Sequence, residues 1–187
     1  MDISDEKLLV ALAQKGDIKA FEKLIEKYQK EIYNLALFKT QNPTLAEEIT
    51  QETIIRIYRN IHKFKFKSSF STWMYRITYN ILKDIVKKFK PLAEISIEDE
   101  TSGCFFKADD EDVEEKINKL EKSKKIRQLI SKIPHKFQFV LILYDIEGKT
   151  YQEIAEILKI RIGTVKSRLF RARKILKDLI IKEKLEL

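Results

Sequence analysis

Apolar side chains recur every three or four residues along most of this chain, which is the spacing of helices with one buried face. After Gly16-Asp17, which ends a short first helix and caps the second, the apolar positions are Phe21, Leu24, Ile25 and Tyr28. The alternation typical of strands does not persist beyond a few residues anywhere in the chain. The sequence therefore predicts an all-α fold.

Prolines and polar capping residues predict further helix ends. Asn42-Pro43 interrupts the second helix. Thr44, with Glu47 three residues later, has the spacing of a capping box and predicts the start of the third helix. Another helix is predicted from about Ser71 to Phe89, because the nearby Pro91 stops it.

Charge divides the chain into blocks more sharply than the net charge of +8 indicates. The net charge is −3 over residues 1–55, +9 over 56–90, −9 over 91–115 and +11 over 116–187. Two basic blocks on either side of an acidic spacer indicate two anion-binding modules, although solvated lysine-rich helices would give the same count. We therefore expect two helical domains, 1–90 and 116–187, joined by a flexible acidic linker at 91–115.

Composition argues against enzymatic chemistry. Four glycines could hardly build a phosphate-binding loop, and the single Cys104 offers neither a disulfide nor a thiolate metal site. His62 and His135 lie in separate domains without neighbours that would make them ligands or bases. We expect no catalytic residue, no metal and no cofactor. No apolar run approaches the ~20 residues that cross a bilayer, so we also expect a cytoplasmic protein without membrane insertion.

The C-terminal block contains a helix-turn-helix pattern. Thr150 and Glu153 form a capping box for a helix from Tyr151 to Leu158. A four-residue break follows, and a second helix is predicted from about Gly163. Gly163 itself is expected to lie in a turn. The apolar face of the second helix comprises Val165, Leu169, Ala172 and Leu176. The opposite face holds Gly163, Lys166, Ser167, Phe170, Arg171 and Lys174, with Arg168 and Arg173 on its flanks, placed to meet phosphates. Arginine reads guanine edges and apolar groups pack on thymine methyls, so this face predicts DNA reading rather than a solvated surface.

Seven aromatic residues lie between Tyr58 and Tyr79, and lysines alternate with them. On the following helix a polar stripe comprises Arg76, Asn80, Lys83 and Lys87. Aromatic rings beside a cationic track suit unpaired bases, which need a stacking face and backbone neutralisation. The alternative is that Phe66, Phe70, Trp73 and Ile77, also at helical spacing, form core. We expect Phe70 to be core, and both readings stay open for Phe64 and Trp73.

Three segments resemble the extracytoplasmic-function group of bacterial sigma factors, in the sigma-70 family. They are residues 64–80 (FKFKSSFSTWMYRITYN), 46–53 (AEEITQET) and 148–173 (GKTYQEIAEILKIRIGTVKSRLFRAR). The resemblance implies two helical domains that bind core RNA polymerase, through its clamp and flap regions, and direct it to promoter DNA. It also implies an anti-sigma partner, a stress or envelope-related regulon and association with the nucleoid in the holoenzyme.

The resemblance assigns roles by motif. Residues matching the polymerase-docking helix are Glu48, Gln51, Glu52 and Ile55. Residues matching the base-capturing loop and the minus-ten helix are Phe64, Lys65, Ser68, Ser69, Trp73, Arg76, Asn80, Lys83 and Lys87. Residues matching the minus-thirty-five readers are Thr164, Lys166, Ser167, Arg168, Phe170, Arg171 and Lys174. Lys159 stands where the family usually has glycine, which implies a lysine at a left-handed turn position and costs up to roughly 1–2 kcal/mol. Arg161 stands where proline is frequent, so the start of the recognition helix is left open.

Two alternatives come from other classes of protein. A dimeric helix-turn-helix repressor would account for the C-terminal pattern but gives no role to the aromatic loop, and intrinsic affinity for a palindromic duplex would favour it. A helical interaction adaptor would make both basic faces incidental. Absence of both polymerase binding and DNA binding at low salt would favour the adaptor.

Overall fold

The computed structural model describes residues 3–89 and 124–183, which contain helices and no strand. The N-terminal helices are α1 (Ile3–Gln14), α2 (Ile18–Thr40), α3 (Pro43–Asn60), the short 3-10 helix η1 (Ile61–Lys63) and α4 (Phe70–Phe89). The C-terminal helices are α6 (His135–Leu141), the π-helical turn η3 (Ile142–Ile146), α7 (Tyr151–Leu158) and α8 (Ile162–Lys182), and residues 124–131 are also helical. The all-α prediction is confirmed. The expected linker at 91–115, with Cys104, lies outside the described residues.

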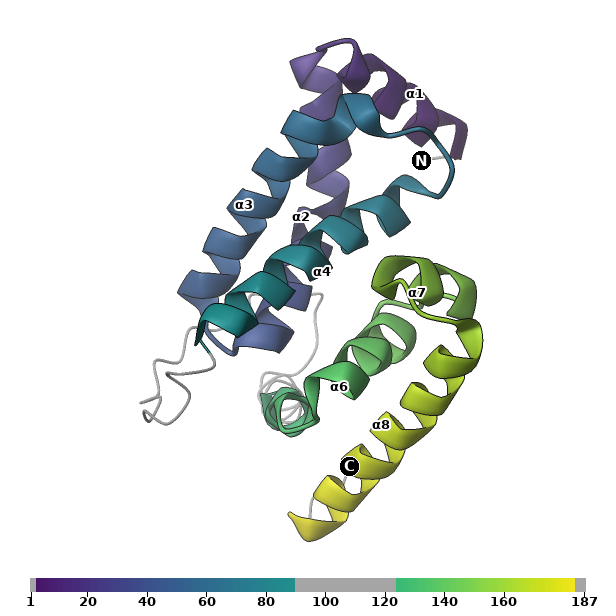
Figure 1. Cartoon of the computed structure of the whole chain (residues 1–187). Coiled ribbons are helices and arrows are strands. Elements are labelled where there is room, and N and C mark those ends of the chain that lie inside the picture. Colours follow the sequence, from purple (N-terminus) through teal and green to yellow (C-terminus); the bar gives the residue numbers. More distant parts are fainter. Residues whose placement is uncertain (1–2, 90–123, 184–187) are drawn as a thin grey trace, which may run out of the picture.

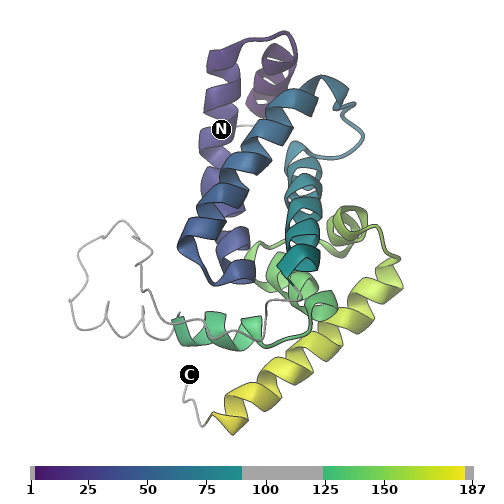
Figure 2. The same ribbon diagram turned by 60° about the vertical axis from the view of Figure 1, so that its left-hand side comes forward.

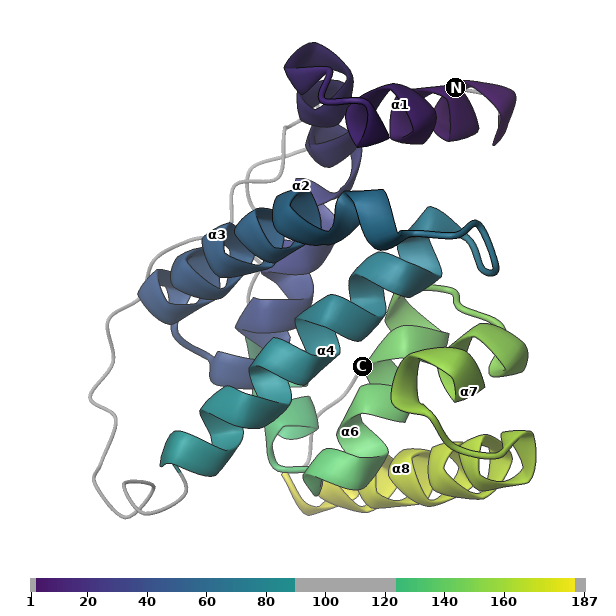
Figure 3. The ribbon, with the colours of Figure 1, turned by 45° about the horizontal axis from the view of Figure 1, so that its top comes forward.

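Helices α2, α3 and α4 pack side by side, and α1 lies across the end of α2 (Figures 1 and 3). Their shared core is made of fully buried side chains, chiefly Leu24, Ile32, Leu35, Ile49, Ile57, Met74 and Leu82. Each such burial contributes about 1.5–3 kcal/mol, which is how the amphipathic pattern of the sequence becomes a stable bundle. The bundle positions the exposed faces of α3 and α4 on its outside.

The third helix begins earlier than its sequence pattern suggested. The side chain of Asn42 caps α3 by accepting a hydrogen bond from the backbone N–H of Leu45 (2.9 Å), and Pro43 is the first helical residue. The predicted Thr44–Glu47 start was wrong because proline suits the first helical position, where no N–H is needed, and asparagine is a strong cap. Helix α4 likewise begins one residue early, at Phe70, with Ser69 Oγ accepting from the N–H of Thr72 (3.0 Å).

Among the C-terminal helices, α8 packs along α6, and α7 lies across the N-terminal end of α8 (Figures 1 and 3). Buried apolar residues of η3, α7 and α8 that belong to the core cluster are Ile142, Leu143, Ile154, Val165, Leu169 and Ala172. The buried faces of α7 and α8 fix the rotation of α8, so its opposite face points outward.

The C-terminal helices also pack against α4, with α7 the main contact (Figures 2 and 3). Tyr75 is fully buried there, and its hydroxyl lies 2.8 Å from a carboxylate oxygen of Glu31 and 2.5 Å from one of Glu147. Lys149 donates to Ser71 Oγ (2.8 Å), and its Nζ lies 4.7 Å from the Tyr75 ring centroid. The Tyr75 hydroxyl can donate its single proton to only one of the two carboxylates. Their closeness therefore favours protonation of one of the carboxyl groups.

This packing is expected to weaken as the pH rises. Burial, followed by the nearby Glu31 carboxylate, raises the pKa of Glu147 above its ordinary 4.5, although the Tyr75 hydroxyl and Lys149 oppose the shift. Separation of the two groups of helices would restore the ordinary pKa. The packed state therefore binds a proton on Glu147 more tightly than the separated state does. The contribution of this protonation to the free energy of packing is fully present below pH 4.5 and is lost as the pH rises through the raised pKa.

The radius of gyration of the full chain, measured by small-angle X-ray scattering, should accordingly increase over that pH range. Glu147→Gln should remove the dependence, because glutamine stays neutral and still accepts from Tyr75. Glu156→Gln, at an exposed position on α7, should retain it. If Glu147→Gln follows the wild-type profile, a different group titrates.

Candidate nucleic-acid and polymerase interfaces

Helices α7 and α8 form the expected helix-turn-helix. The capping box at the start of α7 is complete, because the N–H of Glu153 donates to Thr150 Oγ1 (3.2 Å) and the N–H of Thr150 donates to Glu153 Oε2 (2.9 Å). Burial opposes ionisation of Glu153, but the two groups of Thr150 that donate to its carboxylate hold its pKa below the usual value. The predicted bounds of α7, Tyr151 and Leu158, are confirmed.

The turn between these helices places Lys159 in the left-handed region, with φ of 53°, as the resemblance implied. Helix α8 begins at Ile162, and the carbonyl of Arg161 accepts from the N–H groups of Thr164 (2.8 Å) and Val165 (3.1 Å). Gly163 was expected in a turn but lies in the first turn of α8, because the left-handed residue of the turn between α7 and α8 is Lys159.

Lys159→Gly is expected to raise the free energy of unfolding by about 1 kcal/mol, because glycine has no Cβ to strain a left-handed C-cap. Urea unfolding followed by circular dichroism measures the change. Lys159→Ala keeps the Cβ and should give no comparable gain. Equal gains from both variants would assign the effect to the lysine side chain instead of the backbone geometry.

The outward face of α8 carries the side chains predicted to read duplex DNA. Lys166, Ser167, Phe170, Arg171 and Lys174 are exposed, while Thr164 and Arg168 are half-buried at its border. Phe170 is 72% exposed, which is unusual for a large apolar side chain without a partner surface. The face therefore combines cations, a hydroxyl and an apolar ring on one helix that can enter a major groove.

A groove of about 540 Å³ runs along this face of α8. It is lined by Tyr151, Lys166, Leu169, Phe170, Arg173, Lys174 and Lys177. The guanidinium of Arg173, which the sequence places on a flank facing phosphates, forms an ion pair with Asp145 and lies 5.2 Å from the Tyr144 ring centroid. The remaining cations of the groove are the lysines, which suit phosphate contacts.

The loop between η1 and α4 brings the aromatic residues together. Phe64 is 5% exposed and packs against Phe70 and Trp73, at ring-centroid distances of 6.0 and 5.3 Å. Phe70 is buried, as expected for core, whereas Trp73 is half-buried. Phe66 differs from this core group because it is 45% exposed, with its ring 5.0 Å from that of Phe64.

Lys65, Ser69 and the half-buried Ser68 complete the loop, and the polar stripe of α4 begins beside it. Asn80 and Lys83 are exposed and Arg76 is half-buried on α4. Lys87 belongs to the same helix, but its side chain lies outside the described ones. Ser71 and Tyr75, which contact Lys149 and Glu147 of the C-terminal group, lie on a face of α4 roughly opposite the stripe at 100° per residue. The polar stripe therefore stays accessible to a binding partner while the N-terminal and C-terminal groups of helices are in contact.

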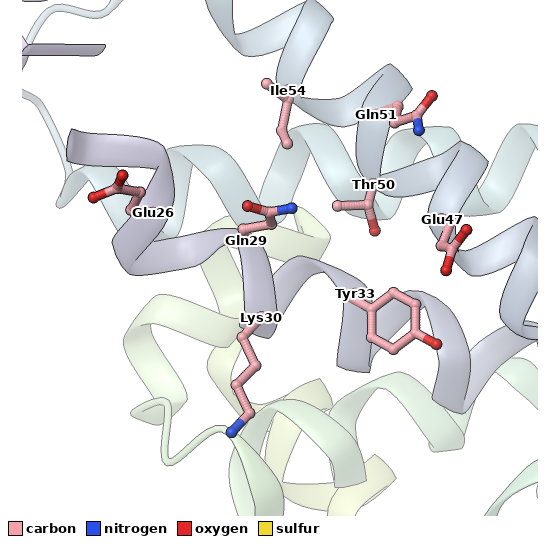
Figure 4. A pocket seen from close by; sticks show the side chains of 8 residues that line it. All are labelled: Glu26, Gln29, Lys30, Tyr33, Glu47, Thr50, Gln51 and Ile54. Atoms are coloured by element: carbon pink, nitrogen blue, oxygen red, sulfur yellow. The ribbon is translucent and has the colours of Figure 1, made fainter. Parts of the chain in front are cut away.

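The residues predicted to dock on polymerase share one face of α3. Glu48, Gln51 and Ile55 are exposed, and Ile55 presents 43% of its apolar surface to solvent. Glu52 is engaged locally, since Arg56 Nε donates to it at 2.6 Å. Beside this face, α2 and α3 enclose a groove of about 500 Å³ (Figure 4), lined by Glu26, Gln29, Lys30, Tyr33, Glu47, Thr50, Gln51 and Ile54. Gln51 belongs to both surfaces, so a partner helix on α3 could extend into the groove.

Comparison with known proteins matches two separate stretches of the chain to family models. Residues 24–90 match the family model "Sigma-70 region 2", and residues 123–176 match "Sigma-70, region 4". The ECF RNA polymerase sigma factor SigW of Bacillus subtilis is 39% identical over 169 residues, which cover 88% of this chain and 90% of SigW. The RNA polymerase sigma-H factor of Pseudomonas aeruginosa is 34% identical over 173 residues, covering 88% of each chain.

The chain belongs to the extracytoplasmic-function (ECF) sigma factors. Its fold is that of solved sigma-factor structures with lower identity. The structure described as CnrH in complex with the cytosolic domain of CnrY superposes with a TM-score of 0.72 at 20% identity, covering 95% of this chain and 98% of that one. The sigma factor RpoE of Bartonella quintana, solved with the anti-sigma factor NepR, superposes with a TM-score of 0.66 at 20% identity, covering 87% and 98%.

Two features of this ECF sigma factor were not anticipated from its sequence. Phe66 is exposed although it was grouped with possible core residues, and Gln14 on α1 donates to the carbonyls of Ile61 (2.9 Å) and Phe64 (2.7 Å). A lone glutamine 47 and 50 residues from its partners has no sequence signal. The exposure of Phe66 had no sequence signal either, because its spacing from Phe70 and Trp73 suggests a helix that residues 64–69 do not form.

Proposed function

We propose that this chain binds core RNA polymerase and directs it to promoters with two separate DNA-contacting faces. The observation that carries the proposal is the pair of basic, aromatic-bearing faces, one on α8 and one along α4 with its loop. On α8 the face is shaped for a duplex groove, and on α4 it combines cations with aromatic rings as single strands require. A single-face duplex binder gives no role to the second surface.

The proposal assigns each face an element of the promoter. Lys166, Ser167, Phe170 and Arg171 contact bases of the minus-thirty-five element, and Thr164, Arg168 and Lys174 contact its phosphates. The loop 64–69, with Trp73, Arg76, Asn80, Lys83 and Lys87, opens and reads the minus-ten element. Residues 1–90 and 116–187 act as two domains, and 91–115 link them over the promoter.

Promoter opening in this scheme needs no hydrolysis by the chain itself, because captured bases offset the cost of unpairing. We therefore propose a transcription initiation factor without enzymatic activity, metal or cofactor. The described residues hold no cluster of three or more His, Cys, Asp or Glu side chains arranged to bind a metal. No helix of the described part is long and apolar enough to cross a membrane.

The proposed partners are core polymerase, promoter DNA and an anti-sigma factor. Glu48, Gln51, Glu52 and Ile55 dock on the clamp, and the C-terminal domain meets the flap. The anti-sigma partner is supported by the solved RpoE of Bartonella quintana, which is bound to the anti-sigma factor NepR. A regulon of stress or envelope genes, a cytoplasmic location and association with the nucleoid within the holoenzyme complete the proposal.

Run-off transcription with core polymerase on genomic DNA tests this function directly. The wild-type chain should produce discrete transcripts that core polymerase alone does not. Ile55→Asp should reduce them at least ten-fold and weaken binding to core polymerase, because a charge replaces an exposed apolar anchor of the docking face. Leu8→Asp, at an even more exposed apolar position on α1, should have little effect. Palindromic duplex binding without polymerase, together with no transcripts, would support a repressor instead.

A further inference from the structure

We propose that Phe66 is a stacking surface for an unpaired promoter base and that Gln14 is the residue that positions it. The inference rests on the proposed function, since it names the contact that the loop 64–69 makes within it. The occupant is one base of the opened DNA strand, because the surface combines an aromatic face with flanking cations.

Phe66 lies at the outer end of a column of aromatic rings. Tyr28 and Phe70 are in contact inside the N-terminal bundle, with ring centroids 5.5 Å apart, and Phe64 packs edge-on against Phe70. The Phe66 ring then packs on Phe64 at 5.0 Å with an interplanar angle of 53°. The buried rings below it hold Phe66 in place, so its outer surface is preorganised for another flat ring.

The backbone of Phe66 is in the left-handed region, with φ of 56°. A bulky residue there is an outlier that costs free energy, and such residues persist where the surrounding structure determines them. A chain selected only for stability would place glycine or asparagine at this position. An exposed phenylalanine held in an unfavourable conformation is instead consistent with a contact made by its ring.

Charge around the ring matches the backbone of a nucleic acid. Lys65 and Lys67 flank Phe66 and are exposed, and exposed cations beside an aromatic platform are what single-strand binding requires. Trp73 packs on Phe64 from α4, which connects this surface to the polar stripe that begins at Arg76. A base stacked on Phe66 would thus lie at the start of the track proposed for the minus-ten strand.

Gln14 holds this loop from a distant part of the chain. Its side-chain amide donates to the carbonyl oxygens of Ile61 and Phe64, one on each side of the bend that precedes Phe66. The same bend lies beside α1 in Figures 1 and 3. These bonds of Gln14 go to backbone carbonyls, so it acts through the backbone that carries Phe64 and Phe66.

The test uses holoenzyme, made of the full chain and core polymerase, with a pre-melted promoter fragment. The fragment carries 2-aminopurine at successive positions of its non-template strand. Wild-type holoenzyme should quench the probe at one position by stacking. Phe66→Gly should abolish that quenching and weaken binding of the fragment roughly ten-fold or more. Tyr58→Leu, at an exposed aromatic of α3, should behave as wild type.

Unfolding cannot mimic this result, because glycine suits the left-handed backbone and Phe66→Gly should be at least as stable to urea as wild type. Unchanged quenching and binding in Phe66→Gly would overturn the inference while leaving the proposed function standing. Failure of the wild-type holoenzyme to bind the fragment at all would overturn the proposed function, and this inference with it.

A double variant tests the positioning role. Gln14→Met, which keeps the length of the side chain but cannot donate to the carbonyls, should reduce quenching several-fold. Gln14→Met should also weaken binding of the pre-melted fragment to wild-type holoenzyme. In the Phe66→Gly background, where quenching is already absent, it should not weaken binding of the fragment further, because the positioned ring is gone. A purely structural role for Gln14 predicts additive losses in the two backgrounds, and that result would overturn its assignment.

Discussion

Trp73→Ala is expected to abolish promoter opening by the holoenzyme on duplex DNA while polymerase binding persists. The proposed docking residues Glu48 and Gln51 lie on α3, and the proposed minus-thirty-five face lies on α8, so neither depends on this side chain. Opening should fail because support for unpaired bases, worth about 1–3 kcal/mol per base, is lost. Permanganate reactivity of thymines measures opening, and a pre-melted bubble should largely restore it.

Asn80→Ala provides the matched comparison on the same helix. Its amide offers hydrogen bonds and no stacking face, so opening should continue while the choice of captured base becomes less selective. The competing account of Trp73 is structural, because its half-buried ring packs on Phe64 and Phe70. Loss of polymerase binding by Trp73→Ala, with loss of helical signal, would establish that account.

Arg171→Ala is expected to weaken promoter-specific binding of the holoenzyme by about 1–3 kcal/mol and to relax preference at a single base position. Arg171 is exposed on the face of α8 opposite the buried Val165, Leu169 and Ala172, where a side chain can reach base edges. Binding to a series of minus-thirty-five variants, each with one substituted base pair, measures this effect.

Lys174→Ala, one helical turn further along α8, should behave differently. Its exposed ammonium is assigned to a phosphate, so binding should weaken equally for every promoter variant. The slope of log affinity against log salt should fall by about one charge. Identical behaviour of the Arg171 and Lys174 variants would mean that the recognition face is rotated from the one proposed.

Local sequence was sufficient where a helical period or a cap determines the geometry. Val165, Leu169 and Ala172 were predicted and found on the buried face of α8, which placed the opposite face correctly. The capping box at Thr150 predicted the first residue of α7. The same reasoning failed at α3, because Asn42 and Pro43 together make a stronger helix start than Thr44.

The sequence by itself determined the all-α fold, the helix-turn-helix and the outward face of its second helix, because each follows from spacing within about twenty residues. Tertiary structure alone decided which aromatic of the loop is exposed, Phe66 and not Phe64, because a segment without a helical period does not specify its buried side. It also decided that Arg173 pairs with Asp145 and that Tyr75 lies between Glu31 and Glu147. Those contacts join residues 28, 44 and 72 positions apart, and only the packing of whole helices brings such residues together.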